Sequence, residues 1–207
     1  MNKNPSGASV TRLPAAKRRE TTVQAVLELA AVQNPAEITT SAIAEQMHIT
    51  QGALFRHFAT KEAIWQAVME WVAERILALV DDAAKSSHSP LAALEAVFHA
   101  HIDFVVKHPG VPRILFGELQ RAGDSPAKRA VRTLLRQYGE RLQTLIARGQ
   151  SQGEVVPDVN TADVAALFVG MIQGLVMQAL LTGKGNRIRK KGAEVFSVYL
   201  RGIRRTL

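Results

Sequence analysis

Hydroxyl, amide and cationic side chains gather in one short stretch, Thr39–Lys61. Thr39, Thr40 and Thr50 stand where short helices are expected to begin, and their hydroxyl groups and the free backbone N–H groups at those helix starts suit phosphate oxygens. Lys61 adds a cation at the far end of the stretch. This chemistry is that of binding to a nucleic-acid backbone and to base edges.

The spacing within this stretch predicts a helix-turn-helix. Two helices of about two turns each, at about 40–47 and 51–57, would be joined by a turn of three or four residues. The second helix would expose a face that fits the major groove of DNA. A pair of short helices that merely pack is the alternative interpretation. Five apolar residues are spaced to fill the core beneath: Ile43, Met47, Ile49, Leu54 and Phe58. We expect DNA contacts from Thr39, Thr40, Thr50, Gln51, Gly52, Ala53, Phe55, Arg56, His57 and Lys61.

Other clusters in the sequence give little support for catalysis or for a resident cofactor. Glu95, His99 and Asp103 lie at i, i+4 and i+8 of an expected helix, and imidazole with carboxylate suits zinc. Three side chains on one helix rarely complete a metal site, so we expect a polar face and no metal. The chain has no cysteine, which excludes a thiol nucleophile and disulfide bonds. Metalloprotease, hydrolase and phosphate-loop motifs are absent, so we expect no catalytic residues and no cofactor.

Charge is divided unevenly along the 207 residues. The chain has 26 Lys and Arg against 18 Asp and Glu, a net charge of +8, so a polyanion is a plausible partner. The excess lies in residues 1–61 and 184–207, whereas residues 62–183 are mildly acidic. A chain that coats nucleic acid along its whole length would not be divided in this way. The pattern favours a basic head and a larger body with another task.

Helical periodicity extends over most of the chain, and we find no strand alternation, so we expect an all-α fold of about nine helices. Residues 1–14 read as a disordered basic arm, residues 15–62 as the helix-turn-helix head, and residues 63–207 as a helical body. Helix 61–85 would connect the head to the body. The expected helices span about 15–32, 40–47, 51–57, 61–85, 90–108, 112–121, 126–149, 161–182 and 187–204.

Val164–Leu181 is the one stretch near the length of a membrane span. Gln173 and Gln178 lie inside it, which favours a helix buried in protein. The first residues are polar and basic, unlike a secretory signal. We therefore expect no membrane partner and a cytoplasmic, nucleoid-associated protein.

One motif carries a family resemblance. Thr39-x3-Ile43-Ala44, followed by Ile49-Thr50-x-Gly52-x-Leu54-Phe55-x-His57-Phe58-x-x-Lys61-Glu62, resembles the signature of TetR/AcrR-type transcriptional repressors. The resemblance is sharpest over about 17–72 and continues weakly into 149–174. It implies a homodimer with three-helix heads that bind double-stranded DNA at a near-palindromic operator. It also implies that residues 63–207 form a ligand-binding and dimerisation domain, in which a small-molecule effector releases the DNA.

The resemblance also implies roles for single residues. Thr39 and Thr50 would cap helices and contact phosphates. His57 and Lys61 would contact phosphates only. Gln51 and Ala53 would face bases. Two positions depart from the family pattern: Phe55 stands where the family has a phosphate-binding Tyr, and His48 where it favours Gly in the turn. We expect a positive φ at His48, which His tolerates better than most residues.

The body must provide dimerisation if two heads read DNA together. Helices 161–182 and 187–204 are the candidates, with the Gly170-x3-Gly174 pair permitting close approach of a partner backbone; an ordinary core helix is the alternative. We expect the dimer interface at Gly170, Gly174, Phe196 and Tyr199. We expect the ligand pocket at Phe98, His101, Ile102, Phe116, Leu119, Phe168, Met171 and Met177, several of which plain core packing would also explain.

Two alternative functions stay open. The stretch from His108 through the following long helix is also similar to TetR-fold nucleoid-occlusion proteins, in which the body binds a cell-division protein instead of a metabolite. A helical enzyme or carrier that binds no DNA is the less favoured alternative.

Overall fold

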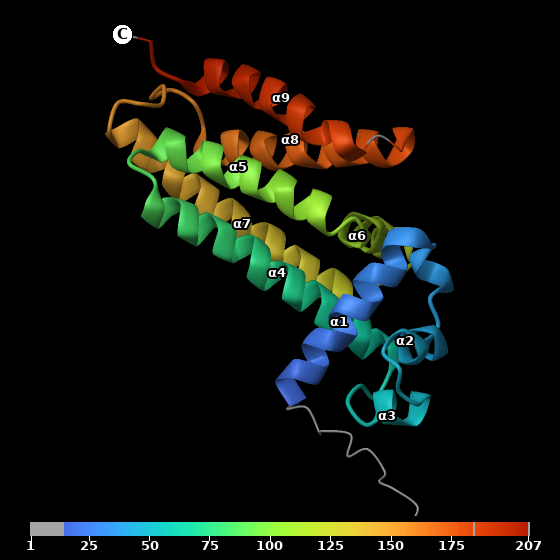
Figure 1. The fold of residues 1–207 in the computed structure, drawn as a ribbon. Helices are drawn as coiled ribbons and strands as arrows, with labels where there is room; N and C mark the ends of the chain where they lie inside the picture. Colours follow the sequence, from blue (N-terminus) through green and yellow to red (C-terminus); the bar gives the residue numbers. More distant parts are fainter. Residues whose placement is uncertain (1–14, 184, 207) are drawn as a thin grey trace, which may run out of the picture.

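The computed structural model describes residues 15–183 and 185–206, and these form an all-α fold with nine α-helices (Figure 1). The predicted fold class and helix number are therefore confirmed for this part of the chain, while the predicted arm 1–14 lies outside it. The helices are α1 Ala15–Val32, α2 Thr40–Gln46, α3 Gln51–Phe55, α4 Lys61–Ser86, α5 Pro90–Lys107, α6 Gly110–Gln120, α7 Pro126–Ser151, α8 Thr161–Thr182 and α9 Ile188–Ile203.

Polar side chains set the starts of most of these helices. The side chains of Thr39 and Thr50 each accept a hydrogen bond from the backbone N–H of the residue three positions later, so the predicted caps of α2 and α3 are confirmed. Thr60, Ser89 and Ser125 do the same for α4, α5 and α7. Each cap satisfies one of the backbone N–H groups that a helix leaves unpaired at its start.

The helices form two parts, which Figure 1 shows end to end. Helices α4, α5 and α7 lie side by side, and α8 and α9 form a layer against α5 and α7. Helices α1, α2 and α3 occupy the other end, where α1 packs on α4 and α6. Long helix α4 belongs to both parts, because it begins beside α3 and continues along the body.

A small apolar core holds α2 and α3 beneath α1. The predicted members Ile43, Leu54 and Phe58 are buried there, and Met47 is partly buried. Ile49 was expected in this core, but it is exposed. It lies in the turn between the two helices, outside the helical faces that meet α1.

Helix α8 is covered on only part of its surface. It is the one helix in the described ranges that is long and apolar enough to span a membrane, and only 33% of its most apolar 18 residues are buried. The predicted burial of this helix is therefore met on one face in the single chain, and the other face is open. Leu167 of α8 and Val198 of α9 are 56% and 59% exposed. Burying such side chains is worth about 1.5–3 kcal/mol each.

Helices α1 and α6 approach each other closely at Gly110, which faces the backbone of Leu27. A Cβ on Gly110 would lie 2.2 Å from the carbonyl oxygen of Leu27 and 3.2 Å from the Cβ of Ala30. Helix α6 begins at Gly110, two residues before the predicted start at Pro112. Only a residue without a side chain permits this approach, which joins α6 of the body to α1.

We predict that Gly110→Ala destabilises the protein, since the new methyl group would force α6 away from Leu27. The cost of such overpacking is about 1–3 kcal/mol, measured by chemical unfolding. Gly117→Ala on the same helix is the matched control, because its Cβ would be 3.9 Å from the nearest atom outside the helix. We expect the control to leave stability unchanged or to raise it by up to about 1 kcal/mol. Equal stabilities for the two variants would contradict the prediction.

Candidate nucleic-acid interface and body cavity

Helix α3 is held from below and open outward. Leu54 is buried in the small core, whereas Gln51, Gly52, Phe55 and Arg56 lie on the exposed face. Nothing lies within 4 Å of the Cβ that Gly52 lacks. The open face and the missing side chain leave room for another molecule to approach the start of α3 closely.

The turn before α3 has the backbone conformation that the sequence predicts. His48 has a φ of 54°, the only positive φ of a residue other than glycine in the described ranges. The N–H of His48 donates to the carbonyl of Glu45, and the N–H of Ile49 donates to that of Ala44. These bonds close the end of α2 and set the direction of α3.

Two hydrogen bonds involve predicted residues on this face. Gln51 donates a 2.7 Å bond to the hydroxyl of Thr40, which joins the starts of α3 and α2. Arg18 of α1 donates a 2.8 Å bond to Nε2 of His57. Arg18 was not among the predicted residues. The run Lys17–Arg19 was a signal of positive charge, but the sequence did not show that α1 passes beside His57.

Lys61 lies at the first position of α4, close to Trp65. Its ammonium group is 5.7 Å from the centre of the Trp65 ring. Lys61 lines a groove between α6 and the first turn of α4, and Glu118 and Arg121 line the other side of this groove. Desolvation, followed by the positive charge of Arg121, lowers the pKa of Lys61, although Glu62 opposes this. Lys61 therefore faces a groove that α4 and α6 both line.

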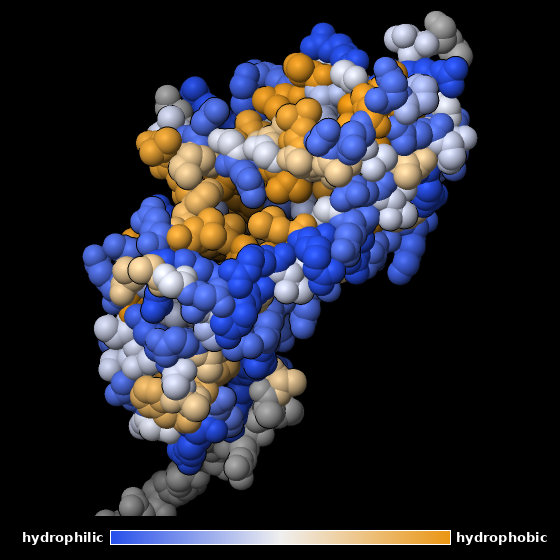
Figure 2. All heavy atoms as spheres, turned by 180° about the vertical axis from the view of Figure 1, so that it is seen from behind, coloured by the Kyte–Doolittle hydropathy of each residue, from blue (hydrophilic) through white to orange (hydrophobic). Residues whose placement is uncertain are grey.

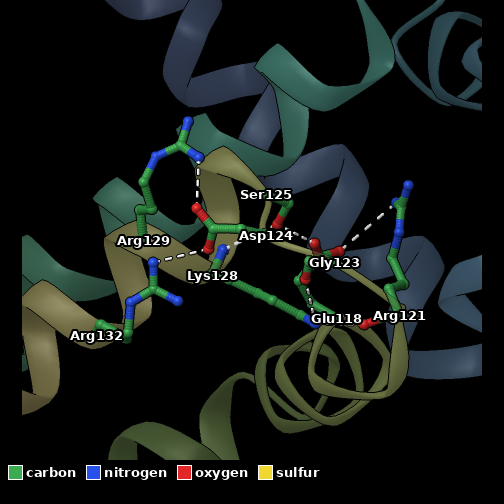
Figure 3. A network of polar contacts seen from close by, with 8 residues as sticks. All are labelled: Glu118, Arg121, Gly123, Asp124, Ser125, Lys128, Arg129 and Arg132. Atoms are coloured by element: carbon green, nitrogen blue, oxygen red, sulfur yellow. Dashed lines mark hydrogen bonds and ion pairs between the residues drawn. The ribbon is translucent and has the colours of Figure 1, made fainter.

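The far end of α6 is fastened to α7 by a polar network (Figure 3). The nearly buried carboxylate of Glu118 accepts a hydrogen bond from Ser125 and lies 3.6 Å from Arg121. Lys128 donates to the carbonyl oxygens of Arg121 and Gly123. Asp124 accepts from both Arg129 and Arg132. Helix α6 is therefore held to α1 near its start and to α7 beyond its end.

A cavity of about 130 Å³ lies in the body among α4, α5, α6, α7 and α8. Three predicted pocket residues, His101, Phe116 and Leu119, line it. The other five do not. Phe98, Ile102 and Phe168 are buried in the packing of α5, α8 and α9, Met171 lines a surface groove with α9, and Met177 is exposed. Their position along a helix indicated an apolar face, but not which neighbouring helix covers it.

One polar pair faces this cavity. Nδ1 of His101 and the hydroxyl of Tyr138 are 3.0 Å apart, and both residues line the cavity wall. Burial lowers the pKa of His101 to about 4 and raises the pKa of the Tyr138 phenol. Both side chains are therefore uncharged near neutral pH.

The proposed dimer residues divide into two groups. Gly170 and Gly174 lie on the exposed side of α8, with nothing within 4 Å of their missing Cβ atoms. Phe196 and Tyr199 are only 1% and 4% exposed. Their rings pack on Phe168 inside the chain, and Tyr199 also lines a surface groove between α8 and α9.

The histidine and acidic residues of α5 are split between two partners. His99 lies 4.0 Å from Glu95, whereas Asp103 forms an ion pair with Arg189 of α9. The Asp103–Arg189 pair joins α5 to α9, whereas the Glu95–His99 pair lies within α5.

The pKa of His101 predicts how stability depends on pH. The unfolded chain takes up this proton near pH 6.5 and the folded chain near pH 4, so acid favours unfolding over this interval and has no such effect above it. From about pH 7 to about pH 5, the native protein should lose up to about 2 kcal/mol more than His101→Gln. Urea unfolding at each pH measures this difference. The same pH dependence in both proteins would show that His101 titrates normally.

Two family models match this chain, one in the head and one in the body. Residues 22–68 match the model of bacterial regulatory proteins of the tetR family, and residues 87–177 match the tetracyclin repressor-like C-terminal domain. The nucleoid occlusion factor SlmA of Marinobacter nauticus is 30% identical over 173 residues, which cover 79% of this chain and 86% of that protein.

Solved structures share the fold. A TetR transcription regulator from Haloarcula marismortui superposes with a TM-score of 0.80 at 17% identity, over 92% of this chain and all of that one. The transcriptional regulator FadR from Bacillus subtilis, solved in complex with stearoyl-CoA, gives a TM-score of 0.78 at 16% identity, over 89% and 98% of the two chains. From the matches in both halves of the sequence, the chain belongs to the TetR family of DNA-binding bacterial regulatory proteins.

Proposed function

We propose that this protein is a homodimeric transcriptional repressor that binds a near-palindromic operator and is released from it by a small molecule. The proposal places the protein at the nucleoid in the cytoplasm. The observation that carries it is the open, capped helix α3 on a head (residues 15–62) that is joined to a body (residues 63–207) containing an apolar cavity.

The exposed face of α3 supports reading of the major groove. Gln51 and Ala53 would face bases, Ala53 against a thymine methyl group. Thr39, Thr40, Thr50 and His57 would contact phosphates, with Arg18 orienting His57. Gly52 leaves room for the DNA backbone. Phe55 brings no hydroxyl group to a phosphate, and Arg56 beside it supplies a cation in its place. The positive charge of Lys61 would add to the electrostatic attraction between the head and DNA.

The open side of α8 and α9 supports a dimer. Apolar atoms gather over this layer and in a hollow below it in Figure 2. Between these two helices is a surface groove, which is lined by Leu167 and Met171 of α8 and by Val198 of α9. Gly170 and Gly174 would let a partner helix approach closely. Two copies of these helices, packed face to face, would form a four-helix interface.

Helix α6 supports a route from the cavity to the head. Phe116 and Leu119 of α6 line the cavity, and Gly110 of the same helix touches Leu27 of α1. Helix α4, which begins at the head, also lines the cavity through Val72. A ligand that binds more tightly when α6 and α4 are shifted would favour the shifted conformation. In that conformation the two heads of the dimer would be too far apart to bind two half-sites spaced about 34–36 Å apart.

We predict that Gln51→Ala with Arg56→Ala weakens binding to DNA from the protein's own upstream region by at least about 10-fold. The loss should be larger for a palindrome than for unrelated DNA. Affinity should also fall steeply between about 50 and about 200 mM salt, since phosphate contacts release counterions. Fluorescence anisotropy measures both effects.

The control for this pair is Arg136→Ala with Gln152→Ala, which changes the same residue types on the exposed surface of α7 and at its end. Binding that is not selective for a palindrome, or equal loss in both double variants, would contradict the assignment. A protein with no DNA affinity would favour the helical enzyme or carrier.

We predict that Leu167→Glu and Val198→Glu each convert the dimer into monomers, because a carboxylate would be buried without a partner at the interface. Sedimentation equilibrium measures the mass. Val32→Glu, which changes an exposed apolar residue at the end of α1, should leave the dimer intact. A native protein that sediments as a monomer would refute the proposed interface.

A second candidate function rests on the 30% identity to the nucleoid occlusion factor SlmA. In this alternative the head binds DNA in the same way, but the body binds a cell-division protein. Binding of purified division proteins to the DNA-bound dimer, with no effect of cavity ligands on the DNA complex, would select this candidate over the first.

A further inference from the structure

The lining of the body cavity is almost entirely apolar. Among its lining residues only His101, Tyr138 and Gln173 are polar, and none carries a carboxylate, an ammonium or a guanidinium group. Resting on the proposed function, we infer that the effector is an uncharged, mainly apolar molecule about the size of one six-membered ring, with one oxygen that accepts a hydrogen bond from His101.

Charge excludes ionic ligands from this site. An ion that loses its water needs an opposite charge or several hydrogen bonds to compensate, and otherwise its burial costs several kcal/mol. The lining offers no opposite charge for an anion or for a cation. His101 does not supply one at neutral pH, since burial keeps its imidazole neutral.

The hydrogen bond between His101 and Tyr138 sets the direction of the ligand's bond. The Tyr138 hydroxyl has one hydrogen to donate, and its ring is buried. Among the described residues, its one hydrogen bond is to Nδ1 of His101. A hydroxyl that did not donate here would leave its hydrogen unpaired in an apolar site, at a cost of about 1–3 kcal/mol. Nδ1 therefore accepts, and the single proton of the neutral imidazole lies on Nε2, which is a donor.

The volume of the cavity limits the size of the ligand. A cavity of about 130 Å³ is slightly smaller than the roughly 150 Å³ engineered cavity of another protein that binds benzene. One six-membered ring is therefore the limit for the enclosed part, and a short substituent must extend into the opening to the surface. Leu119 and Leu135 line the cavity and are also exposed, so they form its opening to the surface. An aromatic ketone of this size meets all three requirements.

Three probes of nearly equal shape test the inference: acetophenone, its hydrocarbon analogue α-methylstyrene, and the anion benzoate. Isothermal titration calorimetry on the DNA-free dimer should show binding of acetophenone and no binding of benzoate. In His101→Phe, the ratio of acetophenone to α-methylstyrene affinity should fall by about 3- to 10-fold, the value of one net hydrogen bond. Tyr138→Phe is a milder change and should also lower this affinity ratio. Without the Tyr138 hydroxyl, the proton of His101 is no longer confined to Nε2, so the donor to the ligand is present only part of the time.

Nitrogen NMR of the His101 ring gives an independent measurement. We expect Nε2 to carry the proton in the native protein and its shift to change when acetophenone binds. Absence of acetophenone binding, tighter binding of benzoate, or an unchanged affinity ratio in both variants would overturn the inference.

The operator complex provides a separate readout for the proposed function. Acetophenone that binds as predicted but leaves the DNA complex intact would refute ligand-released repression while leaving the assigned ligand chemistry standing. Loss of all probe binding with normal operator binding would refute the ligand class alone.

Discussion

Helix α3 has only five residues, and the rest of the account depends on how so short a helix is held in place. An isolated helix shorter than about 12 residues is marginal in water, so its own hydrogen bonds do not stabilise it. Burial of Leu54 and Phe58 beneath α1 does, together with the Thr50 cap. The surface that we propose for DNA binding is therefore fixed by the small core below it, and the side chains above that core are free to make contacts outward.

In the proposed repressor, the same kind of fixed contact would link the body to the head. Helix α6 has one side on the cavity, through Phe116, and another on α1, through Gly110. The contact at Gly110 has no flexible side chain to absorb a shift, so a displacement of α6 moves α1 as well. At its other end, the Glu118–Ser125 hydrogen bond ties α6 to α7. A molecule in the cavity would thus act on a helix held by backbone contact at one end and by a polar network at the other.

Sequence reasoning was most accurate where local chemistry determines structure. The caps at Thr39 and Thr50, and the positive φ of His48, depend on neighbouring residues and were predicted. Contacts between distant helices were not: the bond from Arg18 to His57 spans 39 residues. Periodicity placed Phe196 on an apolar face without showing that α5 and α8 already cover it. The cavity was found in part, because His101 is a polar residue on an otherwise apolar face, whereas Met177 had no such distinguishing feature.

Amide hydrogen exchange, with and without DNA selected from a random-sequence library, tests the central claim most directly. Binding should slow exchange in residues 39–57, and most of all at the amides of α3, while α5 and α7 keep their free rates. This pattern would establish the open face of α3 as the DNA-binding surface. Protection confined to the basic start of α9, with unchanged exchange in α2 and α3, would contradict the account.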